Sequence, residues 1–123
     1  MQIVYILIIL TLLIGNNCIG QNLDNWMGQH KGRLKITNIN GTESYHNMAL
    51  NIEQISDSSY HWQIIYSSDS TQDIRNYILK KTSLDDHFII DEQNTILLDL
   101  NKINNSFYSV FEINNYLLFV EYR

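Results

Sequence analysis

Two carboxylates on neighbouring predicted strands come nearest, in this sequence, to a catalytic arrangement. Asp99 and Glu112 supply the pair of carboxylates that glycoside hydrolysis requires as a minimum. Each lies opposite apolar residues within its strand, which places it on the solvent side of a sheet. We therefore expect both to be solvated. The sequence has no Gly-x-Ser-x-Gly, P-loop or Cys–His motif, and we expect a non-enzymatic protein.

Histidines and acidic pairs are the candidate metal ligands, and their spacing does not favour a metal site. No histidine is followed two residues later by a second His or Cys, so a zinc site would have to assemble from distant strands. The acidic pairs sit beside predicted turns without the Asp-x-Asp-x-Asp-Gly pattern of a calcium loop. We expect no metal and no cofactor. The residues are His30, His46, His61 and His87, and the pairs are Asp85-Asp86 and Asp91-Glu92.

A row of aromatic residues is the best candidate for binding. Tyr60, Trp62 and Tyr66 share one face of a predicted strand, and Tyr77 lies on the next strand. Buried Tyr and Trp need partners for their polar tips, which a ligand or water in a cavity would supply. The row thus predicts a site for a small apolar or amphipathic ligand. The alternative is that the same residues pack a filled core.

Short apolar segments alternating with polar turns must position these residues. The predicted strands are 26–38, 46–55, 60–67, 75–82, 87–91, 95–103, 106–113 and 116–123. Asn-rich breaks separate them, because Asn bonds to its own backbone and tolerates positive φ. Parallel pairing needs crossovers of a dozen or more residues, for which there is no room. We expect an all-β fold: an antiparallel meander of about eight strands.

The last strands leave open whether this meander closes. Leu117 and Phe119 oppose Leu118 and Val120, so the final strand is apolar on both faces. Either it pairs with the first strand and closes a barrel, or the sheet stays open or incomplete. Further chain, a partner or a second subunit would then cover the second face. This pattern favours self-association through the last strand, and it supports the alternative function of a structural or interaction protein.

The first twenty residues resemble a signal peptide. The apolar run 3–14 is too short to span a bilayer core of ~30 Å, and the residues near Gly20 suit cleavage before Gln21. We expect an exported domain over 21–123 that meets the membrane only before cleavage. Lipidation at Cys18 is the alternative, but Gly15 and two Asn precede it in place of the usual lipoprotein pattern.

Composition narrows the class of partner. The net charge is −5, and Lys31, Arg33 and Lys35 form one basic row on the exposed side of a predicted strand, so we expect no nucleic-acid binding. The only cysteine would leave with the signal peptide, so the domain has no disulfide. The sequons at Asn40 and Asn104 matter only in a eukaryotic secretory pathway.

The segment Asn25-Trp26-Met27-Gly28, followed by Gly32 and Leu34, resembles the opening strand of calycin barrels, which include lipocalins and fatty-acid-binding proteins. Lipocalins carry Gly-x-Trp there, whereas this chain has Asp24 in place of the Gly. The resemblance implies that Trp26 packs across the closed end of a barrel beneath a late arginine, a role open to Arg123. It also implies a small apolar ligand and no chemistry. The Trp-x-Gly-x-x-x-Gly-x-Leu start and the segment 90–94 (IDEQN) are similar to those of small secreted bacterial β proteins, which names no activity.

Overall fold

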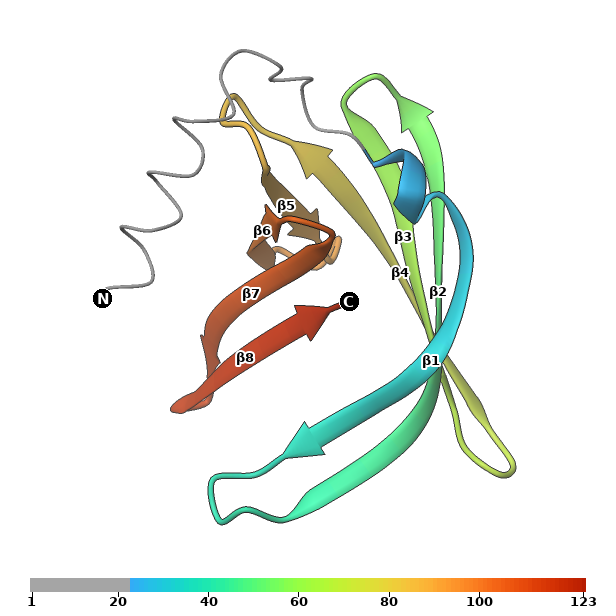
Figure 1. Cartoon of the computed structure of the whole chain (residues 1–123), viewed down its shortest axis with the longest axis vertical. Helices are drawn as coiled ribbons and strands as arrows, with labels where there is room; N and C mark the ends of the chain where they lie inside the picture. The colour runs from blue at the N-terminus through green and yellow to red at the C-terminus, as the bar shows by residue number, and fades with distance from the viewer. Residues whose placement is uncertain (1–22) are drawn as a thin grey trace.

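Eight strands pair in chain order to form one strongly curled antiparallel sheet (Figure 1). The computed structural model describes residues 23–123, and the predicted all-β meander is confirmed there. The sheet curls into a half-barrel. Its strands are β1 (Gly28–Thr37), β2 (Glu43–Ser56), β3 (Ser59–Ser67), β4 (Gln72–Lys81), β5 (His87–Asp91), β6 (Leu97–Ile103), β7 (Ser106–Ile113) and β8 (Tyr116–Tyr122).

Asparagine and glycine shape the turns between these strands. Asn104, Asn114 and Asn115 have φ of 56°, 50° and 66°, the left-handed region that Asn tolerates. In the β1–β2 turn, Gly41 has φ 84°. There the side-chain oxygen of Asn40 accepts a hydrogen bond from the Thr42 amide at 3.0 Å. The Asn-rich breaks are therefore tight hairpin turns, as predicted.

The start of the chain differs from the predicted strand. Trp26 lies in a short 3-10 helix, η1 (Asp24–Trp26), and β1 begins two residues later at Gly28. Gly28 has φ 90°, a conformation that glycine adopts without strain, and it turns the chain from η1 into the sheet. As a result Leu23 and Trp26 point into the interior instead of lying along the first strand.

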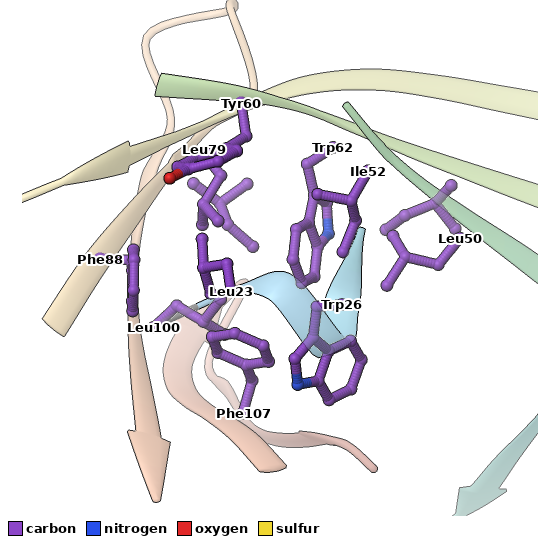
Figure 2. Close-up of a cluster of buried hydrophobic side chains, with 12 residues drawn as sticks. Leu23, Trp26, Leu50, Ile52, Tyr60, Trp62, Leu79, Phe88, Leu100 and Phe107 are labelled. Carbon is purple, nitrogen blue, oxygen red and sulfur yellow. The ribbon is translucent and has the colours of Figure 1, made fainter. Parts of the chain in front are cut away.

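The core fills the inside of the curl because inward side chains of neighbouring strands face one another. Leu50 pairs with Ile64, and Ile52 pairs with Trp62. These side chains are buried, whereas the residues between them on β2 and β3 face outward. Figure 2 shows the cluster, which also takes in Leu79, Phe88, Leu100 and Phe107 from the later strands.

Aromatic contacts join the late strands to the early ones across the interior. The ring of Phe107 on β7 lies 4.8 Å from that of Trp26, 5.6 Å from Trp62 and 5.8 Å from Phe88, each edge to face. Tyr122 on β8 meets Trp62 in the same way at 5.3 Å. The curl therefore brings β7 and β8 against β3, although they are far apart in the order of the sheet.

The strand pairs described within residues 23–123 leave β1 and β8 as the two edges of an open sheet. The β7–β8 hairpin exposes large apolar side chains on both faces, as its pattern predicted. Leu117 (75% exposed) and Phe119 (67%) lie on the outer face with Val110, while Tyr116 (73%) lies on the other face.

Some sequence predictions fall on residues that the structure does not describe. These are the signal peptide over 1–20, its cleavage between Gly20 and Gln21, and the alternative lipidation of Cys18. From residue 23 onward, no helix has the length and apolar character needed to cross a bilayer.

Candidate functional site

The two carboxylates considered for catalysis lie on the outer face of the sheet. Asp99 on β6 has a side chain that is 72% exposed, and its Oδ1 is 2.9 Å from Nε2 of His87. Glu112 on β7 is exposed and pairs with Leu117 across the hairpin. Both are solvated, as the strand pattern predicted.

Several of the candidate metal ligands bond to other protein groups. Asp91 accepts hydrogen bonds from Nζ of Lys80 at 2.9 Å and from the Gln93 amide at 2.8 Å, and these two donors lower the pKa of its carboxyl. Nε2 of His30 lies 2.8 Å from the carbonyl oxygen of Trp26. Across residues 23–123, no group of three or more His, Cys, Asp or Glu side chains is placed to hold a metal ion.

The aromatic row divides into a buried half and a partly exposed half. All four members lie on the inner face, where Trp62 pairs with Tyr77. Tyr60 and Trp62 are core residues, with Trp62 fully buried. Tyr66 and Tyr77 are half-buried and pack against the edge of the core. The two half-buried tyrosines are therefore the members of the row that a ligand can reach.

Two residues that sequence reasoning missed complete this site. Tyr122 reaches it from β8, in contact with Trp62. Glu92 follows β5, where the register Leu79–Ile90, Ile78–Asp91 continues to place Glu92 opposite Tyr77. Nε2 of Gln93 donates to the carbonyl of Asn76 at 3.2 Å, which holds this turn against β4. We call Tyr66, Tyr77, Tyr122 and Glu92 the tyrosine cluster.

Alternation along β5 was the signal available for Glu92, since it shares a face with Ile90. No local signal pointed to Tyr122. Its contact with Trp62 depends on how far the sheet curls, which a strand pattern does not encode.

Burial and nearby charges change the pKa values of the three tyrosines of the cluster. Burial raises the pKa of Tyr66, of Tyr77 and, most strongly, of Tyr122. The negative charge of Glu92 adds to the rise of the pKa at each hydroxyl. The positive charge of Arg75, two residues from Tyr77 on the same face of β4, opposes this rise at Tyr66 and Tyr77.

These raised pKa values predict a loss of stability at alkaline pH. Above the ordinary tyrosine pKa near 10, the unfolded chain releases the three phenol protons while the folded chain keeps them. The folded state then binds more protons than the unfolded state, so the free energy of unfolding falls as pH rises above about 10. Urea unfolding at a series of pH values between about 9 and 12, around the ordinary tyrosine pKa, measures the fall in the free energy of unfolding.

One substitution tests this prediction. Tyr122→Phe should flatten the alkaline fall, because it removes the phenol whose pKa is raised most strongly. The phenolate absorbance of the folded protein should rise at higher pH than that of the urea-unfolded protein. Coincident phenolate titrations of the folded and unfolded protein would contradict the prediction.

A depression of about 490 Å³ lies elsewhere, mostly on the outer face of β1, β2 and β3. Gln29, Lys31, Asn47, Ile65 and Gln72 are among the residues that line it. Its lining includes no member of the aromatic row or of the tyrosine cluster. The two surfaces are therefore separate.

Comparisons of the chain with protein-family models, curated proteins and solved structures find no match.

Proposed function

We propose that this chain is an exported, non-enzymatic binding module whose inner sheet face takes a small amphipathic ligand. The observation that carries the proposal is the tyrosine cluster. Tyr77 pairs with buried Trp62 and Tyr122 contacts its ring, while Tyr66 lies four residues farther along β3 on the same face. The carboxylate of Glu92 raises the pKa of all three hydroxyls. Aromatic surface with a few convergent polar groups is the usual composition of a small-molecule site.

Some residues of the site would contact the ligand, and others support those residues from the core. The rings of Tyr66 and Tyr77 offer apolar contact area, and their hydroxyls with Glu92 offer polar contacts for one end of a ligand. Tyr60 and Trp62 lie beneath them in the packed core, so they support the site instead of lining it.

Kinship with calycin barrels is part of the same proposal. A curled antiparallel meander is compatible with a barrel fold, and Trp26 packs inside it against Phe107. The role of Arg123 beside Trp26 stays a prediction, as does export through cleavage at Gln21.

Binding of an apolar fluorescent probe tests the proposal. N-phenyl-1-naphthylamine should bind the exported protein, and Tyr77→Ala should weaken that binding about fivefold, because removing one ring loses roughly 1 kcal/mol of stacking and contact. Tyr45→Ala is the matched control. Tyr45 lies on the outer face of β2, paired with Lys35, and is about half exposed.

Thermal unfolding of both variants shows whether a loss of binding reflects a loss of fold. A natively folded wild-type protein that takes up no probe would refute the proposal. If Tyr45→Ala and Tyr77→Ala weaken probe binding equally, the probe does not bind specifically at the inner face.

The apolar β7–β8 hairpin supports a second candidate function, association with a second copy of the chain. Leu117 and Phe119 lie on an edge strand whose unpaired backbone groups invite another strand to pair. Exposure on both faces of the same hairpin is the observation that favours it. The decisive experiment is the second prediction of the Discussion.

A further inference from the structure

We propose that the ligand's polar end is cationic, so that the tyrosine cluster takes an amphiphile with an ammonium group. This inference rests on the proposed function and names the chemical class of its ligand. The contacts around Glu92 and Arg75 carry it.

Arg75 is already neutralised. Its Nε and Nη2 both donate to Oδ2 of Asp73, at 3.0 and 2.7 Å. Asp73 and Arg75 lie two residues apart on β4, so they share the inner face and pair along the strand. An anionic head would have to compete with this carboxylate for the guanidinium.

Glu92 supplies the remaining charge. The Asp73–Arg75 ion pair is neutral as a unit, and Glu92, which the register places opposite Tyr77, adds one negative charge. Another cation on this face, Lys81, lies 5.6 Å from the ring centre of Tyr60. It is four residues beyond Tyr77 on β4, about 13 Å away along the strand. The cluster therefore presents an uncompensated carboxylate.

The rings favour the same sign of charge. The faces of Tyr and Trp carry negative potential and attract cations, and aromatic cages are a recurring means of recognising quaternary ammonium groups. The tyrosines come from three different strands, β3, β4 and β8. Their partial burial reduces screening by solvent and strengthens the attraction.

A head-group series with one alkyl tail tests the proposal. Octyltrimethylammonium, octanoate and octan-1-ol are titrated into the exported protein by calorimetry, below their micelle concentrations. We expect octyltrimethylammonium to bind about fivefold tighter than either of the others, the gain from one partly exposed ion pair with ring contacts.

Glu92→Gln keeps the shape of the side chain and removes its charge. It should abolish the preference for the ammonium head, and its thermal unfolding, compared with that of the wild-type protein, reports whether the variant is folded. Glu53→Gln is the matched control, because Glu53 is exposed on the outer face of β2, paired with His61. It should keep the full preference.

The outcomes separate this inference from the proposed function. Three outcomes would refute the cationic head group but not the amphiphile site. They are equal binding of the three amphiphiles, tightest binding of octanoate, and a preference for ammonium that survives Glu92→Gln. Failure of all three amphiphiles and of N-phenyl-1-naphthylamine to bind would overturn both.

Discussion

Replacing Phe107 by alanine is expected to lower the free energy of unfolding by about 3–5 kcal/mol, the usual cost of deleting a buried aromatic ring. Phe107 is fully buried and contacts Trp26, Trp62 and Phe88 edge to face. Its ring joins η1, β3 and β5 to β7, so the cavity would open where the two halves of the curl meet. Chemical unfolding followed by tryptophan fluorescence measures the change.

Phe119→Ala is the matched control for this experiment. It deletes the same ring from the outer face of β8, where the side chain is mostly exposed, and should change the free energy of unfolding by less than about 0.5 kcal/mol. Both variants are measured at low protein concentration, where association contributes least. Similar costs at the two positions would show that Phe107 does not hold the curl together.

Changing Phe119 to lysine is expected to weaken self-association of the protein about tenfold or more. We expect the wild-type protein to form dimers or larger species through β8, because the edge is long and apolar. A lysine on an edge strand opposes pairing, since a second chain would have to desolvate its charge. A few central residues of an interface each carry more than about 1 kcal/mol, and we expect Phe119 to be one of them. Sedimentation velocity over a range of protein concentrations measures the shift.

Ile39→Lys provides the comparison, because Ile39 is fully exposed in the β1–β2 turn, away from β8. It should leave the sedimentation behaviour unchanged. A wild-type protein that sediments as a monomer at every concentration and unfolds cooperatively would contradict the proposed association. The open edge would then be stable by itself.

Much of the fold could be predicted from the chain because its strands are short and locally paired. The alternation of apolar and polar residues predicted which residues of β2 and β3 point inward, and the Asn-rich breaks predicted the hairpin turns. The start of β1 was misplaced. Trp26 follows no alternation, since η1 directs it into the core.

The candidate site was only partly predictable for a different reason. The local pattern puts Tyr66 and Tyr77 on one face of the sheet, and the structure has them on that face. Whether a residue is core or accessible depends on the curl, which buries Trp62 completely and leaves those two tyrosines half-exposed. The approach of Tyr122 to Trp62 belongs to the same global geometry.

Pairing in chain order has a consequence for how the protein folds. Each strand of the sheet needs only the next strand in sequence, so the hairpins can zip together one after another across short loops at a small entropic cost. The contacts of Trp26 with Phe107 and of Trp62 with Tyr122 close much longer loops. We infer that a nearly flat ribbon of hairpins forms early and rolls up late. Until that last step, the aromatic interior of the finished molecule is open to water and to other copies of the chain.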